Sequence, residues 1–81
     1  MTHAQIRARI REEFPAEAFN QSVGELGAAT EIPPGTLKPV MYGHSQIGAE
    51  RAQKIADALG VPLRELAVLL REDARFLVGS E

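Results

Sequence analysis

The side chains best suited to contact an anion lie in two short stretches of the chain. Arg7 and Arg11 stand four residues apart near the amino terminus, and Lys38 lies alone near the middle. Residues four apart on a helix project from the same face, so the two arginines could add one or two phosphate contacts. The alternative for both is a solvated helix face that pairs with nearby carboxylates such as Glu12 and Glu13.

Hydroxyl, amide and imidazole groups complete the set of candidate contacts. Groups of these kinds hydrogen-bond phosphate oxygens in protein–DNA interfaces. Tyr42 could equally be a half-buried packing residue, and the polar stretch 44–46 could be a simple connecting loop. The candidates of this set are Ser22, Thr36, Tyr42, His44, Ser45 and Gln46.

No group of residues typical of catalysis or metal binding is visible. The chain has no cysteine, and His3 and His44 are far apart with no ligand-like spacing. A nucleophile–base pair and a glycine-rich phosphate loop are also missing, so we expect neither an enzyme nor a cofactor or metal site. Because no apolar run approaches the roughly 20 residues of a membrane span and no secretory signal is visible, we expect a cytoplasmic protein.

The charge of the chain argues against a strong hold on nucleic acid. The formal net charge is −2, whereas proteins that hold phosphates usually carry a basic surface. Between positions 21 and 48, Lys38 stands against two carboxylates, Glu25 and Glu31. A monomer would therefore hold DNA weakly, and a dimer would double the number of contacts.

Hydrophobic periodicity predicts a single small domain of helices. Of the 81 residues, 44% are hydrophobic, and three Phe, one Tyr and no Trp leave the core to Leu, Ile, Val and Ala. Capping patterns, prolines and glycines mark the ends of the helices. The expected helices span about 3–13, 22–30, 36–42, 48–59 and 62–78.

Two of these helix starts depend on specific local patterns. Ser22 opens an S-x-x-E capping box, which predicts a start there, although the helix could instead run unbroken from Pro15. Thr36 is expected to cap the third helix. A start at Pro34 would put Pro39 so deep that the helix would lose a hydrogen bond.

The segment from Lys54 to Leu66 reads KIADALGVPLREL, in which an amphipathic helix, a glycine cap and a further helix start follow one another. This segment and the order of the elements before it resemble the XRE family, the Cro and phage-repressor class of helix-turn-helix proteins, over about residues 22–70. The resemblance implies a small orthogonal all-α bundle of about five helices, lambda-repressor-like, with the motif core at 22–60 and a C-terminal helix at 62–78. It also implies a small phage or bacterial transcription regulator, such as a repressor, that binds double-stranded DNA as a dimer.

The chain departs from the family at the positions that matter most for reading DNA. Glu31 occupies a turn position that is usually glycine. The family slots that face base edges match Pro34, Gly35, Thr36 and Pro39, which offer little to read a base with. The alternative is a helix-turn-helix module that binds a protein partner without strong DNA binding.

The C-terminal tail carries a separate signal. Phe76, Leu77 and Val78 are consecutive apolar residues close to a chain end. Such residues usually dock on the domain's own core or on a partner, so intramolecular packing and dimerisation are both open.

Overall fold

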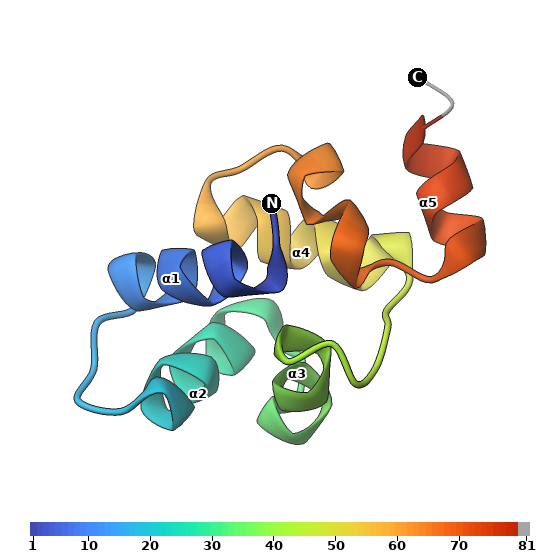
Figure 1. The fold of residues 1–81 in the computed structure, drawn as a ribbon. Coiled ribbons are helices and arrows are strands. Elements are labelled where there is room, and N and C mark those ends of the chain that lie inside the picture. Colours follow the sequence, from blue (N-terminus) through green and yellow to red (C-terminus); the bar gives the residue numbers. More distant parts are fainter. Residues whose placement is uncertain (80–81) are drawn as a thin grey trace.

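The computed structural model describes residues 1–79, which form six helical elements and no β-strand. Figure 1 shows α2 and α3 on one side of α1 and α4, with α5 at the end of the molecule far from α1. The expected small all-α bundle is confirmed. The elements are α1 (His3–Glu13), α2 (Phe19–Thr30), α3 (Pro34–Met41), α4 (Ala49–Leu59), the 3₁₀ helix η1 (Leu63–Leu69) and α5 (Glu72–Gly79).

The core is aliphatic and draws on every helix. Ile6 and Ile10 of α1, Leu26 of α2, Leu37 of α3 and Ile55 of α4 have no exposed surface. Each fully buried side chain of this size stabilises the fold by about 1.5–3 kcal/mol relative to its exposed state. No aromatic ring of residues 1–79 is fully buried, which agrees with the aromatic-poor composition. None of the helices in this range is long and apolar enough to cross a bilayer.

The first helix begins and ends where the local sequence predicts. The Thr2 hydroxyl accepts a hydrogen bond from the Gln5 amide at 3.1 Å, and the Gln5 side chain accepts one from the Thr2 amide at 2.8 Å. This reciprocal capping box satisfies two amides that have no partner inside the helix. The helix ends before Pro15, as expected from the steric restriction on the residue before a proline.

The prediction that α2 starts at Ser22 is wrong, and so is the alternative start at Pro15. The helix begins at Phe19, and the Gln21 side chain accepts a hydrogen bond from the Ala18 amide at 3.3 Å. Ser22 lies inside the helix, is 1% exposed, and its hydroxyl has no hydrogen-bond partner. Its side chain faces the core, so it caps no helix and presents no hydroxyl at the surface.

The turn between α2 and α3 contains the unusual backbone expected at Glu31. This residue has φ of 59°, in the left-handed region that glycine favours. The turn is tight, because Ile32 donates its amide to the Gly27 carbonyl at 3.2 Å. A Cβ at Gly27 would lie 2.8 Å from the Ile32 carbonyl oxygen and 3.2 Å from Pro34 Cγ. Glycine at this position therefore allows α3 to start close against α2.

The third helix starts at Pro34 and not at Thr36, so the prediction of a late start is wrong. The Thr36 amide donates to the Pro33 carbonyl at 2.9 Å, which makes Thr36 part of the first turn. Pro39 lies inside the helix and cannot donate to the carbonyl four residues earlier, that of Gly35. Because Gly35 is exposed, water can reach that carbonyl, and the lost hydrogen bond costs little.

The C-terminal part is broken into two elements where one helix was predicted. Leu70 is extended, with φ of −86° and ψ of 145°, and it is fully buried. On either side of it, the Ile47 amide donates to the Leu69 carbonyl at 2.9 Å, and the Arg71 amide donates to the Ile47 carbonyl at 2.9 Å. These two bonds join the α3–α4 loop to the segment before α5. The Gly60 cap before this region is as predicted, with φ of 68°.

Candidate nucleic-acid interface

The two arginines of α1 lie over aromatic rings. The Arg7 guanidinium carbon is 4.8 Å from the centroid of the Tyr42 ring, and that of Arg11 is 5.2 Å from the centroid of the Phe19 ring. The two rings meet edge to face at 5.9 Å between centroids, with 87° between their planes. We call these four residues the arginine–aromatic cluster. Such contacts restrain an arginine but leave its charge in place.

Neither Arg7 nor Arg11 pairs with Glu12 or Glu13, although such pairing was the alternative interpretation of these two arginines. In the structure it is Arg9 that pairs with these carboxylates, Glu12 at 3.6 Å and Glu13 at 3.3 Å. Arg7 instead donates from Nη1 to the Met41 carbonyl at 2.8 Å, at the C-terminal end of α3. Carbonyls at a helix end lack partners inside the helix and carry partial negative charge, so this bond ties α1 to α3 and holds the guanidinium in place.

A shallow hollow of about 430 Å³ lies next to the cluster, with Tyr42 belonging to both. We call it the Tyr42 hollow. Its lining is mostly apolar, and Tyr42 is 47% exposed. The cluster and the hollow together carry three permanent positive charges and no carboxylate. The hollow is lined by Lys38, Pro39, Tyr42 and His44.

A second group of cationic side chains lies between α3, the α3–α4 loop and the start of α4. Arg51 and Arg71 line a groove of about 300 Å³, which we call the two-arginine groove. A Cβ at Gly48 would lie 2.9 Å from Arg71 Nη2, so glycine at this position leaves room for the guanidinium. Gly48 is also the N-cap of α4 and has no side chain to satisfy the first amides. The groove is completed by Thr36, Gln46, Ile47, Gly48 and Glu50.

The hollow and the groove lie on opposite flanks of α3. Thr36 borders the groove and Lys38 borders the hollow. Successive residues of a helix are rotated by about 100° around its axis. The side chains of two residues two positions apart therefore point in directions about 200° from each other. The exposed face of α3 between them carries Gly35 and the half-buried Pro39, so that face is poor in polar side chains while its flanks are rich in them.

The structure changes the local charge balance. The cluster, the hollow and the groove bring together five permanent cations and two carboxylates, Glu50 of the groove and Asp73, whose Oδ1 is 4.0 Å from Arg71 Nε. The charge count over positions 21–48 did not include four of these cations, because they belong to α1, to α4 and to the segment before α5. Arg51 and Arg71 were not among the candidates at all. The close approach of Arg71 to Gly48 depends on the pairing of Ile47 with the 69–71 segment, which no local pattern reveals.

The remaining sequence candidates are placed as follows. Ser45 and Gln46 are exposed in the α3–α4 loop, as is His44, and Thr36 is half-buried. Ser22 is buried and is no longer a candidate for a phosphate contact through its hydroxyl. The structure therefore places six of the nine candidates in α3 or in direct contact with its two flanks, whereas Arg11 lies over Phe19 at the start of α2 and Ser45 lies in the loop after α3. The six are Arg7, Thr36, Lys38, Tyr42, His44 and Gln46.

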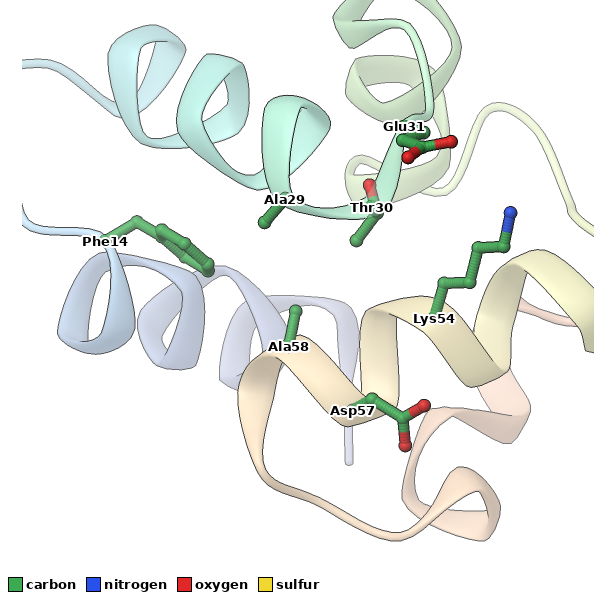
Figure 2. Close-up of a pocket in the computed structure, with 7 residues that line it drawn as sticks. All are labelled: Phe14, Ala29, Thr30, Glu31, Lys54, Asp57 and Ala58. Carbon is green, nitrogen blue, oxygen red and sulfur yellow. The ribbon is translucent and has the colours of Figure 1, made fainter.

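A further hollow, of about 590 Å³, lies between α2 and α4 and is less suited to an anion. Figure 2 shows Phe14 at one end of it, Ala29 and Ala58 on its walls, and charged groups towards the other end. Those groups are two carboxylates and one lysine, which together disfavour a phosphate. The charged residues are Glu31, Lys54 and Asp57.

Comparison of the chain with family models, curated proteins and solved structures gives no match. Within residues 1–79, no three His, Asp or Glu side chains gather as a metal site would need. The arrangement of the cations that flank α3 is suited to holding an extended anion on both sides of one short helix.

Proposed function

We propose that this protein is a DNA-binding transcription regulator in which α3 faces the duplex and its two flanks hold the phosphates. The observation that carries the proposal is the placement of four cations beside α3, and of a fifth, Arg11, over the adjoining start of α2, in a chain whose net charge is −2. A polyanion with phosphates on both sides of a groove matches a helix with cations on both of its flanks.

The two flanks have different means of holding phosphates. On the cluster side, Arg7 and Arg11 are held by aromatic rings, so little side-chain freedom is lost when they meet a phosphate. On the groove side, Arg51 lies in the first turn of α4 with Glu50, and Arg71 lies beside this turn, whose free amides favour an anion. Both kinds of contact are independent of base sequence.

Only a few polar groups of this surface could contact bases. Gly35 and Pro39 on the exposed face of α3 have no side-chain donor or acceptor, so Thr36, Lys38 and the loop residue Gln46 carry what discrimination there is. We therefore expect weak preference among sequences compared with the 10³–10⁷-fold range typical of specific DNA-binding proteins.

The resemblance of residues 22–70 to the XRE family supports the same proposal. The three-residue connection between α2 and α3 is of the kind found in helix-turn-helix proteins. A DNA-binding domain typically makes about 6–10 phosphate contacts, more than five cations of one copy provide. The protein is therefore proposed to act as a dimer, and in a family of this kind as a repressor.

A protein partner is the second candidate, and the Tyr42 hollow is the observation that favours it. An exposed tyrosine beside Pro39 offers an aromatic, apolar surface of the sort that anchors protein interfaces. The prolines before and at the start of α3 are exposed as well. A partner held there would not need the two-arginine groove.

Fluorescence anisotropy with a labelled random-sequence duplex separates the two candidates. For DNA binding by all five cations of a copy, we expect a log–log salt slope of about −4.5 per copy, since each phosphate contact contributes about −0.9. Lys38→Glu should reduce the slope and the affinity. The matched control is Lys54→Glu, which makes the same charge change in the hollow of Figure 2.

Two results would contradict the DNA proposal. One is the absence of binding even near ~50 mM salt, where phosphate contacts are strongest. The other is an equal loss of affinity in the Lys38 and Lys54 variants, which would show that net charge matters and the position around α3 does not.

A further inference from the structure

The hollow of Figure 2 has an apolar end and a charged end. Phe14, half-buried just after α1, lies at the apolar end, and Ala29 of α2 and Ala58 of α4 stand on the two walls. Small side chains on both walls leave the space between the two helices open. The volume of about 590 Å³ lies in the range of roughly 300–1,000 Å³ that is typical of small-molecule sites.

The charged end brings together groups of both signs that do not pair with one another. Lys54 and Asp57 lie three positions apart on α4, and Glu31 stands on the other wall, in the turn after α2. Within the part of the chain that the structure describes, none of these three side chains makes an ion pair. The Asp57 carboxylate is oriented by the Gln53 side-chain amide, which donates to Oδ1 at 2.9 Å. The hollow therefore keeps a positive and two negative groups available to a ligand.

The backbone adds negative charge at the same end. Residues 27–30, the last turn of α2, include no basic side chain, so their carbonyls keep the partial negative charge of a helix C-terminus. The Thr30 hydroxyl donates to the Leu26 carbonyl at 2.8 Å and is not left for a ligand. A ligand that matches this end carries one positive group for the carboxylates and one negative group for the lysine.

The groove of about 260 Å³ between α5 and η1 differs from this hollow in its charges. Leu77 and Val78 of the C-terminal tail line it, and of its described lining residues Arg64 alone is charged, so it offers an ammonium group no partner. In the same tail, Phe76 and Leu77 are exposed and Val78 is half-buried against the core. Only part of the tail thus packs on the domain, and the groove beside it does not match a ligand with both charges.

We propose that the hollow of Figure 2 binds a free α-amino acid with a bulky apolar side chain. The ammonium group of the ligand meets Glu31 and Asp57, and its carboxylate meets Lys54. The side chain of the ligand lies between the two alanine walls and points towards Phe14, where it buries apolar surface. The inference does not rest on the proposed function, because none of these residues belongs to the arginine–aromatic cluster, the Tyr42 hollow or the two-arginine groove.

Titration of the ¹⁵N-labelled full chain with L-phenylalanine, followed by ¹H–¹⁵N NMR, tests the site. Because the hollow is open to solvent, we expect saturable shifts with a dissociation constant on the order of 1 mM. The shifts should concentrate at Phe14, at 29–31 and at 54–58, and the signals of α3 and α5 should stay in place. D-Phenylalanine is the matched control. It has the same charges and the same ring but cannot place all three groups at once, so it should bind at least about fivefold more weakly.

Analogues that lack one charged group test the assignment of the charges. Hydrocinnamate has no ammonium group and brings its carboxylate towards two others, so it should bind at least about tenfold more weakly than L-phenylalanine. Phenethylamine has no carboxylate and should bind about threefold more weakly, as expected for the loss of one exposed ion pair. Lys54→Gln should weaken L-phenylalanine by about the same factor and should not weaken phenethylamine. The matched control is Lys38→Gln, a lysine of the Tyr42 hollow, which should change neither affinity.

A substitution on one wall tests the apolar end without a change of charge. Ala29 is exposed and lines the hollow, so Ala29→Leu should leave the fold intact and fill the space of the ligand's side chain. We expect L-phenylalanine to bind at least about tenfold more weakly to this variant. Ala28→Leu makes the same change at the preceding exposed position, outside the lining, and should bind as the wild type does. Thermal unfolding followed by circular dichroism checks that both variants are folded.

Three outcomes would overturn the inference. One is the absence of saturable shifts at concentrations tenfold above the expected dissociation constant. Another is binding of L-phenylalanine that Ala29→Leu leaves unchanged, which would place the ligand elsewhere. The third is equal binding of L-phenylalanine and D-phenylalanine together with no effect of Lys54→Gln, which would reduce the contact to a nonspecific apolar one. Anisotropy with DNA remains a separate measurement, so a failure of this site and a failure of the proposed function are distinguishable.

Discussion

The exposed face of α3 and the two flanks of that helix are made from opposite kinds of residue. The face carries Gly35 and Pro39, which have no side-chain hydrogen-bonding group. The flanks carry arginines on aromatic rings on one side and the two-arginine groove on the other. In protein–DNA interfaces, phosphate contacts provide affinity and position while base contacts provide discrimination.

This contrast is the basis of the proposal that the protein holds DNA from the sides of α3 more than it reads bases with it. The flanks draw their cations from α1, α3, α4 and the segment before α5, so the proposed binding surface requires the whole folded domain. Substitutions in the flanks should therefore change affinity and its salt dependence. Substitutions on the face should change little.

The largest effect is expected when both flanks lose their arginines. In a chain with Arg7, Arg11, Arg51 and Arg71 all changed to Gln, the log–log salt slope should fall by about 3.6 units, since each phosphate contact contributes about 0.9. Anisotropy titration with a random duplex over a series of salt concentrations measures it. An unchanged slope would show that the flanks do not touch phosphates. Thermal unfolding serves as the control, because Arg7 also bonds to the Met41 carbonyl.

A smaller effect is expected from Tyr42→Ala, which removes the ring beneath Arg7 and keeps every charge. The loss of one cation–π contact and one edge-to-face contact, each about 0.5–1.5 kcal/mol, should loosen the cluster and weaken DNA binding about tenfold. The salt slope should stay the same. Tyr42→Phe is the matched control and should bind as the wild type does. A loss of similar size in the Phe variant would assign the effect to the hydroxyl.

The groove flank can be tested without removing a charge. The Cβ of Gly48→Ala would lie 2.9 Å from Arg71 Nη2, and the end of this flexible side chain can move away. We expect the fold to be retained, the salt slope to fall by up to about one unit and the affinity to fall by about fivefold. Titration of this variant beside Arg71→Gln provides the check. Full affinity in the Gly48 variant together with a loss in the Arg71 variant would show that the guanidinium is not held in place by Gly48.

The smallest effect on binding is expected on the exposed face of α3. A Cβ at Gly35 meets nothing within 4 Å, so Gly35→Ala should raise stability by about 0.5–1 kcal/mol through helix propensity. DNA affinity should stay within about threefold of the wild type on any sequence. Thermal unfolding and anisotropy on several duplexes measure the two quantities. A strong loss on one duplex alone would show that this face reads bases.

Local patterns predicted the parts of the fold whose causes lie within a few residues. The capping box at Thr2 and the glycine cap at Gly60 need only neighbouring residues, and both are present. The positive φ at Glu31 was expected only from the family resemblance, in which this turn position is usually glycine. The all-α class follows from helical periodicity over longer stretches.

The predictions that failed depend on tertiary contacts. Ser22 matches a capping pattern, but burial of its side chain places it inside α2. The continuous C-terminal helix is interrupted at Leu70 because the segment around it pairs with Ile47, more than twenty residues earlier in the chain. A helix start at Pro34 is tolerated because the carbonyl left free by Pro39 is exposed to water.

In the candidate site too, the sequence predicts what depends on local spacing and does not predict what depends on tertiary contacts. That Arg7 and Arg11 share a face follows from their spacing, whereas the rings beneath them come from two other elements. The approach of Arg71 to Gly48 requires the backbone pairing of the α3–α4 loop with the 69–71 segment. Charge counted along the chain therefore understated the positive charge around α3.

The most direct test of flank binding is a titration of the ¹⁵N-labelled protein with a short random duplex, followed by ¹H–¹⁵N NMR. We expect the largest shifts at the side-chain Nε–H signals of Arg7, Arg11, Arg51 and Arg71 and at the amides that begin α4. Signals that line the hollow of Figure 2 should stay in place. Shifts confined to that hollow or to α5, or no shifts at ~50 mM salt, would contradict the account.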